Sequence, residues 1–207
     1  MMIRRAPVCL VMSAPSGAGK TSLTRAMLAA DPSLRLSVSW TTRAPRAGEA
    51  DGVHYHFRPQ AEFDALVAAG GFLESAQVFQ RSYGSPAAPV QKWLDAGHDV
   101  VFDIDWQGHR QLRAALPDRV LGLFILPPSA AALRTRLTGR GDAPSAVEGR
   151  MARAEDEMSH AGEFDHVIVN DDFATALAEA QAVLTAARCA RPRLPGLEAT
   201  LEALRRA

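Results

Sequence analysis

Residues 14–21 read Ala14-Pro15-Ser16-Gly17-Ala18-Gly19-Lys20-Thr21. This is the pattern of a P-loop, with Ala14 in place of the first glycine. Its small residues let successive backbone N–H groups turn inward around a phosphate, and a helix that follows adds its positive N-terminal end. Lys20 would place a charge beside the β- and γ-phosphates, and the Thr21 hydroxyl suits a Mg²⁺ ligand. The stretch therefore predicts a binding loop for a nucleoside triphosphate.

The sequence on either side of this loop predicts a strand and a helix. The apolar run Val8–Met12 is typical of a buried strand. After the loop, Thr21–Ala30 places Leu23 and Met27 at helical spacing, and Pro32 ends the helix because the residue before a proline avoids the helical region. A glycine-containing turn that arose by chance would lack this order of strand, loop and helix, so the context favours the phosphate site.

Apolar strands alternate with helices again towards the C-terminus. The expected strands are Asp99–Ile104, Val120–Leu126 and Val167–Val169, and the expected helices are Trp106–Ala115, Ser129–Leu137, Ser145–Met158, Asp172–Arg188 and a short amphipathic stretch at Leu197–Leu204. Ser145 and Glu148 have the spacing of a capping box. The alternation predicts an α/β fold, in which a P-loop NTPase-type parallel sheet is flanked by helices.

Residues 37–90 do not follow this alternation. They contain several glycines, short alternating runs at Tyr55–Arg58 and Phe72–Phe79, and a short helical pattern at Ala61–Ala69. We expect an inserted region of mixed α+β structure here.

Composition excludes several classes of protein. The chain has 207 residues, with 23 basic and 23 acidic side chains, so its formal net charge is zero. This balance argues against binding nucleic acid or a membrane surface through bulk positive charge. It contains two cysteines, which suits a reduced, cytoplasmic protein, and its apolar runs are too short to cross a membrane. Only Lys20 and Lys92 are lysines, the other basic residues being arginines.

Asp103 and Asp105 end the predicted strand that begins at Asp99. Acidic residues are common at strand ends, but a carboxylate beside a P-loop suits Mg²⁺ or its water shell. We therefore predict that Thr21 and Asp103 hold the metal, Asp103 either directly or through water.

A second phosphate-binding segment follows the P-loop along the chain. Thr41-Thr42-Arg43-Ala44-Pro45-Arg46-Ala47-Gly48-Glu49 places Arg43 and Arg46 on either side of a stiffening proline. Two guanidinium groups held close together can clamp a phosphate dianion, whereas two arginines in isolation more often form a solvated basic turn. These residues alone leave both interpretations open.

The chain resembles the guanylate kinase family. The matching motifs are Thr41–Glu49 with Gly52, Tyr55 and Phe57, then Phe72-Leu73-Glu74, Tyr83-Gly84, Asp103–Gly108, Pro127-Pro128-Ser129, Gly139-Arg140-Gly141 and Val169–Asp172. They occur in order over residues 7–188. The resemblance implies one domain over 1–207, with a core at about 1–36, 98–128 and 165–190. A GMP-binding region would span about 37–90, a lid about 129–164 and a C-terminal tail 191–207.

The reaction implied by the resemblance is Mg²⁺-dependent transfer of the γ-phosphoryl group from ATP to GMP, with dGMP as an alternative acceptor that the sequence leaves open. The acceptor phosphate is already ionised near neutral pH, so catalysis needs positioning and charge stabilisation but no general base. The resemblance implies catalytic roles for Lys20, Arg43, Arg140 and Arg150. ATP would be bound by residues 14–21, that is Ala14, Pro15, Ser16, Gly17, Ala18, Gly19, Lys20 and Thr21, together with Arg136 and Asn170. GMP would be bound by Ser39, Arg43, Arg46, Tyr55, Glu74, Tyr83, Ser85 and Asp105.

The hydrogen-bonding groups of guanine agree with a carboxylate at position 74 that recognises the base. Guanine presents its N1–H and its exocyclic amino group on one edge, and a carboxylate such as Glu74 accepts from both. Adenine has no such pair of donors, so AMP would leave a buried Glu74 unsatisfied, and sites of this kind discriminate by up to ~10⁴-fold.

Two rival functions share the P-loop or the fold. A related kinase that acts on a phosphorylated ribose would not need Ser39, Glu74 and Ser85, and a non-catalytic guanylate-kinase-like binding module would typically lose the P-loop. A homo-oligomer is a further alternative that the sequence leaves open.

Ser82 and Trp40 depart from the family pattern beside the GMP site. Arg153 is expected to pair with Glu157 on a solvated helix face.

Overall fold

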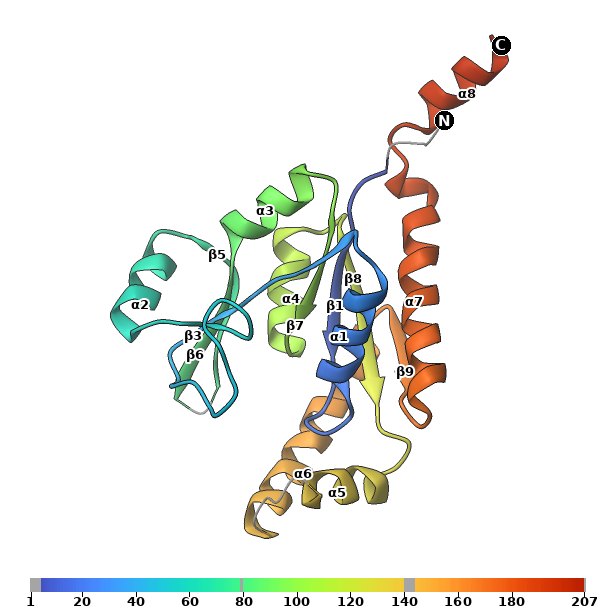
Figure 1. Cartoon of the computed structure of the whole chain (residues 1–207). Helices are drawn as coiled ribbons and strands as arrows, with labels where there is room; N and C mark the ends of the chain where they lie inside the picture. Colours follow the sequence, from blue (N-terminus) through green and yellow to red (C-terminus); the bar gives the residue numbers. More distant parts are fainter. Residues whose placement is uncertain (1–4, 79, 140–143, 207) are drawn as a thin grey trace.

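In the computed structural model, which describes residues 5–78, 80–139 and 144–206, the chain forms two sheets (Figure 1). The larger sheet has the order β2-β7-β1-β8-β9, and all its pairings are parallel. Its strands are β1 (Cys9–Ser13), β2 (Leu34–Leu36), β7 (Asp99–Asp103), β8 (Val120–Leu126) and β9 (His166–Val169). The predicted α/β fold, with a parallel sheet flanked by helices, is confirmed.

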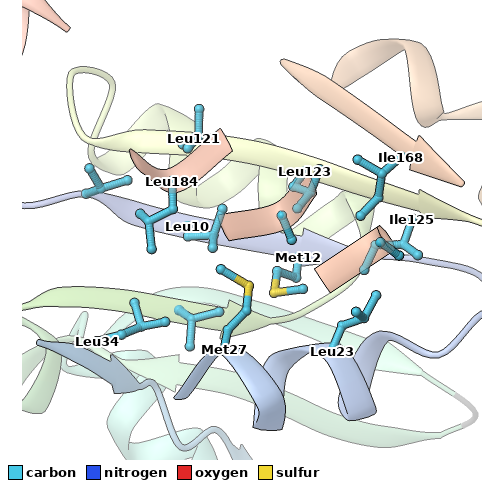
Figure 2. Close-up of a cluster of buried hydrophobic side chains, with 14 of the residues drawn as sticks. Leu10, Met12, Leu23, Met27, Leu34, Leu121, Leu123, Ile125, Ile168 and Leu184 are labelled. Atoms are coloured by element: carbon cyan, nitrogen blue, oxygen red, sulfur yellow. The ribbon is translucent and has the colours of Figure 1, made fainter. Parts of the chain in front are cut away.

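Helices cover both faces of this sheet. Figure 2 shows one face, where Leu10 and Met12 of β1 pack with Leu23 and Met27 of α1 (Lys20–Ala30). Helix α7 (Phe173–Cys189) completes that layer, and α3 (Ala87–Asp95) and α4 (Trp106–Ala115) cover the opposite face. Because β1 is buried on both sides, it reads as a continuous apolar run rather than an alternating one.

A smaller sheet forms within residues 37–90. Its order is β4-β3-β6-β5, with strands β3 (Trp40–Thr41), β4 (His56–Phe57), β5 (Phe72–Val78) and β6 (Arg81–Pro86), and α2 (Gln60–Ala68) lies between β4 and β5 in the chain. Strands β5 and β6 form a hairpin whose register places Glu74 opposite Ser85. Strand β5 of the smaller sheet packs against α4, a helix of the larger unit, and so links the two parts of the fold (Figure 1).

Two packed helices, α5 (Ala130–Thr138) and α6 (Pro144–Ser159), follow β8. Leu133, Leu137, Val147 and Ala154 form the apolar contact between them. The predicted capping box is wrong, because α6 already includes Ser145, and Glu148 instead forms an ion pair with Arg134 of α5.

A short helical segment, η1 (Ala161–Glu163), precedes β9. After α7 the chain ends in η2 (Arg191–Arg193) and α8 (Leu197–Arg205). Helix α8 projects away from the rest of the molecule (Figure 1). Within the described ranges, none of the helices has the length and apolar character needed to cross a lipid bilayer.

Candidate active site

The P-loop lies between β1 and α1, at the carboxyl end of the central strand of the larger sheet. Gly17 and Gly19 adopt φ values of 99° and 101°, a left-handed region that favours glycine. Ala14 is not among the residues with positive φ, which explains why alanine can replace glycine there. Buried Asn170 supports the loop from outside, since its Nδ2 donates to the Ala18 carbonyl at 2.7 Å.

Gly19→Ala is expected to distort this loop. An added Cβ would lie 2.2 Å from Asn170 Nδ2, and alanine is strained at this φ. The strain and the lost hydrogen bond should together lower the free energy of unfolding by about 2–3 kcal/mol. Calorimetric titration with ATP should show at least about tenfold weaker binding. Gly149→Ala is the matched control, because open space surrounds that position on α6; equal ATP affinity in both variants would contradict the prediction.

Asp103 connects Lys20 with Thr21 at the base of the loop. Lys20 Nζ lies 2.6 Å from Asp103 Oδ1, and Thr21 Oγ1 donates to Asp103 Oδ2 at 3.2 Å. Lys20 also donates to the Ile104 carbonyl at 3.2 Å. Burial alone would lower the pKa of Lys20, but the Asp103 carboxylate outweighs it, so the pKa lies above its ordinary value. The ammonium group is therefore charged at neutral pH.

Arg43 lines a second pocket, next to the cleft of the P-loop, and is held in place by an ion pair with Glu49. Its two terminal nitrogens each lie 2.6 Å from a Glu49 oxygen, and its guanidinium stacks over Tyr55 at 5.0 Å. The Glu49 carboxylate holds the pKa of Arg43 above its usual range, and Arg43 in turn lowers the pKa of Glu49 to about 2. Arg46 is exposed, and its backbone N–H donates to Glu49 at 2.7 Å. The predicted clamp thus has one rigid and one exposed arginine.

Glu74 lies at the far end of the same pocket. Its side chain is 5% exposed, and it accepts from Ser85 Oγ at 2.6 Å through Oε1. Burial raises its pKa to about 7; the Ser85 hydrogen bond opposes this rise and Asp105 adds to it. Ser39 Oγ lies 3.4 Å from Ser85 Oγ. These acceptors and hydroxyls suit a planar ligand that presents hydrogen-bond donors.

Asp105 caps helix α4 and also lines the pocket that contains Glu74. Its Oδ1 accepts from the backbone N–H groups of Gln107 and Gly108, both at 3.0 Å, and so caps α4. A Cβ at Gly108 would lie 2.9 Å from Glu74 Oε2, so the glycine makes room for that carboxylate.

The two pockets share part of their lining. A cavity of about 270 Å³ is bounded by Ser39, Arg43, Glu74, Tyr83 and Asp105 at one end, whereas the P-loop residues bound a cleft of about 340 Å³. Lys20, Arg46, Tyr55 and Asp103 line both. The structure thus brings the phosphate loop next to seven of the eight residues predicted to bind the second substrate, and the eighth, Ser85, is buried and donates to Glu74.

The predicted lid residues are placed less uniformly. Arg136 donates to the Asn170 carbonyl at 2.9 Å, and Arg150 is half-buried on α6. Arg140 lies outside the described residues. Arg153 forms the expected pair with Glu157 at 3.2 Å, but it also lines the 270 Å³ cavity and is therefore not a purely solvated side chain.

Four residues near the site were given no role there by the sequence analysis: Glu49, Gly108, Arg153 and Glu157. The first two appeared only as members of motifs and the last two only as a solvated pair, because spacing along the chain does not reveal their contacts with the site. Glu157, for example, accepts from the Ser16 backbone N–H, 141 positions earlier in the chain.

The two departures from the family pattern are accommodated by packing. Ser82 Oγ accepts from Gln60 Nε2 at 3.1 Å, and its backbone N–H donates to Thr42 Oγ1 at 3.0 Å. Trp40 packs edge-on against Phe72 with ring centroids 5.8 Å apart. Both residues therefore help to hold the smaller sheet together.

Comparison with known proteins gives one consistent family. Residues 6–187 match the model of the family described as guanylate kinase. A guanylate kinase from Granulibacter bethesdensis is 60% identical over 184 residues, which are 89% of this chain and 86% of that relative. One from Gluconobacter oxydans is 60% identical over 190 residues, 91% of each. The crystal structure of guanylate kinase from Anaplasma phagocytophilum has a TM-score of 0.81 and 32% identity, and the match covers 98% of this chain and 97% of that one.

Proposed function

Because the chain belongs to the guanylate kinase family and is a nucleoside monophosphate kinase, we propose that its P-loop binds ATP and that the 270 Å³ cavity binds GMP. One observation carries this assignment. The P-loop cleft and the cavity share four lining residues, Lys20, Arg46, Tyr55 and Asp103. A γ-phosphate bound on the loop and an acceptor phosphate bound beside Arg43 would therefore be neighbours.

Each end of GMP has a matching set of side chains. Arg43 and Arg46 supply positive charge for the phosphate dianion, with Tyr55 and Tyr83 beside them. Glu74 accepts from guanine N1–H and from the exocyclic amino group, while Ser39, Ser85 and Asp105 surround the base edge. Since Glu49 already orients Arg43, little side-chain entropy remains to be lost when the phosphate binds.

The donor set beside the loop fits Mg²⁺. Thr21 Oγ1 and the Asp103 carboxylate are hard oxygen donors 3.2 Å apart. Within the described part of the chain, no cluster of three or more acidic, histidine or cysteine side chains forms a closed metal cage. Mg²⁺ suits such an incomplete site, because it keeps several waters and takes its other ligands from substrate phosphates. When bound, Mg²⁺ would neutralise phosphate charge and orient the triphosphate.

This chain's own residues supply the rest of the chemistry. Backbone N–H groups of residues 16–21 and the N-terminus of α1 stabilise the negative charge of the phosphates. Lys20 adds a cation between the two pockets, and Arg150 and Arg153 on α6 and Arg140 of the lid can add positive charge around the transferring group. The acceptor is an ionised phosphate oxygen, so no side chain has to remove a proton from it.

A coupled assay of ADP release tests the assignment. ATP is supplied with GMP, dGMP, AMP, CMP, UMP or a phosphorylated ribose, each with and without Mg²⁺. GMP should support the fastest release, at least about 10²-fold above AMP, and omission of Mg²⁺ should abolish it. Release with AMP or the phosphorylated ribose but not with GMP would overturn the proposal, and no release with any acceptor would favour a non-catalytic binding module.

We further infer a cytoplasmic location and a role in guanine nucleotide synthesis and recycling. On this proposal, residues 37–90 act as the GMP-binding region, 129–164 as the lid and 191–207 as a tail. Nucleic acid is not an expected partner. The sequence leaves the choice between a monomer and a homo-oligomer open, and light scattering coupled to size-exclusion chromatography decides it.

A further inference from the structure

Glu157 of α6 places a carboxylate in the cleft of the P-loop. Its Oε2 accepts from the Ser16 backbone N–H at 3.2 Å, and its Oε1 accepts from Arg153 Nε at 3.2 Å. The side chain is 15% exposed and lines the same 340 Å³ cleft as residues 14–17 and 19–22. An anionic side chain thus lies where the loop is built to receive an anion.

The electrostatics of the cleft agree with this position. Burial raises the pKa of Glu157, whereas Arg153, the Ser16 N–H and Lys20 oppose the rise. The Glu157 carboxylate therefore interacts with Lys20 and with the Ser16 N–H, the same cation and backbone donor that a phosphate of ATP would contact. Two anions cannot share these partners in one cleft without repelling each other.

We propose that Glu157 is a positioning residue that occupies one anion position of the P-loop in the nucleotide-free enzyme and is displaced by a phosphate oxygen of the donor nucleotide. The proposal rests on the assignment of the P-loop as the donor site. Through its second oxygen Glu157 also holds Arg153, which lines the acceptor cavity. Entry of the donor therefore breaks the contact between Glu157 of α6 and the Ser16 N–H of the loop.

Glu157→Gln tests the competition directly. Glutamine keeps the size of the side chain and its hydrogen-bonding oxygen but removes the charge that repels phosphate. Calorimetric titration with ATP, and separately with inorganic tripolyphosphate, should show binding about three- to tenfold tighter than in the wild type. The gain should shrink at high salt, because screening weakens the repulsion. Damage to the fold would weaken binding, so a tighter complex cannot arise from a merely structural role.

The matched control is Glu155→Gln, an identical change on an exposed position of the same helix, which should leave both affinities unchanged. Glu157→Ala provides a second variant, and hydrogen exchange of the Ser16 amide should be faster in it than in the nucleotide-free wild type. Unchanged or weaker ATP and tripolyphosphate binding by Glu157→Gln would overturn the proposal, the weaker result indicating that Glu157 helps to hold the donor. If the wild type itself does not bind ATP, the donor-site assignment fails instead.

Discussion

Lys20→Ala should lower kcat by about 10³-fold while GMP affinity changes by less than about fivefold. The ammonium group is mostly buried between the P-loop and the acceptor cavity and is fixed by Asp103 at 2.6 Å. A cation held there costs no reorganisation when negative charge moves from the donor to the acceptor phosphate. The GMP phosphate, by contrast, would still meet Arg43 and Arg46.

Single-turnover kinetics and calorimetric titration with GMP separate these two effects. The chain offers a matched control, because Lys92 is its only other lysine and lies exposed on α3, away from both pockets. Lys92→Ala should behave as the wild type. Equal turnover by Lys20→Ala and Lys92→Ala would refute the catalytic role of Lys20, whereas a large loss of GMP affinity would place Lys20 in the acceptor site instead.

Sequence patterns predicted the larger sheet well because its elements are long and buried on a regular period. The expected Val120–Leu126 and Trp106–Ala115 coincide with β8 and α4, and the other predicted elements of that unit differ by one residue at their ends. The three-residue β2 and the helix α3 were not predicted. The smaller sheet was predicted in part. The runs Tyr55–Arg58 and Phe72–Phe79 contain β4 and β5, Phe79 lying outside the described residues, whereas β3 and β6 were not predicted. Strand β3 has two residues and is defined by pairing with Tyr83 and Gly84, about 40 positions away. Strand β6 contains Gly84 and Pro86, which are typical of turns.

The same distinction holds within the site. Residues expected to touch substrate belong to short motifs, and seven of the eight residues predicted to bind GMP line one cavity, while Ser85 adjoins it through its hydrogen bond to Glu74. Their supporting contacts are tertiary. Glu157 contacts Ser16 across 141 positions, and Asn170, which its motif places at the ATP site, also holds the loop through Ala18 across 152 positions. Such partners depend on how α6 and β9 approach the loop, and no local pattern encodes that approach.

Glu74→Gln should reduce the preference for GMP over AMP by on the order of 10²–10³. In the proposed site the carboxylate would accept from both guanine donors, whereas an amide presents one acceptor and one donor, which match the N6 amino group and N1 of adenine. The measurement is the ratio of kcat/KM for the two acceptors with ATP fixed. Glu62→Gln is the control, since it makes the same change on an exposed position of α2 in the same region. An unchanged ratio in Glu74→Gln would refute the guanine-reading role.

The raised pKa of Glu74 predicts how both the KM for GMP and the stability of the fold change with pH. Its pKa in the folded protein is about 7, above the ordinary 4.5, so the protonated form grows as pH falls below 7 and cannot accept both guanine donors. KM for GMP should therefore rise between pH 8 and pH 6 in the wild type and vary less in Glu74→Gln. The folded state binds more protons than the unfolded state between pH 4.5 and 7, so this group's contribution makes the fold less stable as pH rises through that window.

Removing the charge should consequently stabilise the fold at the expense of specificity. In urea unfolding without nucleotide at pH 8, Glu74→Gln should be more stable than the wild type by about 2–3 kcal/mol, and the difference should disappear near pH 4.5. A buried carboxylate that destabilises its own fold at neutral pH has to be explained by something other than folding, and two guanine donors provide that explanation. If Glu74→Gln were less stable than the wild type at pH 8, the carboxylate would instead be a structural acceptor for Ser85.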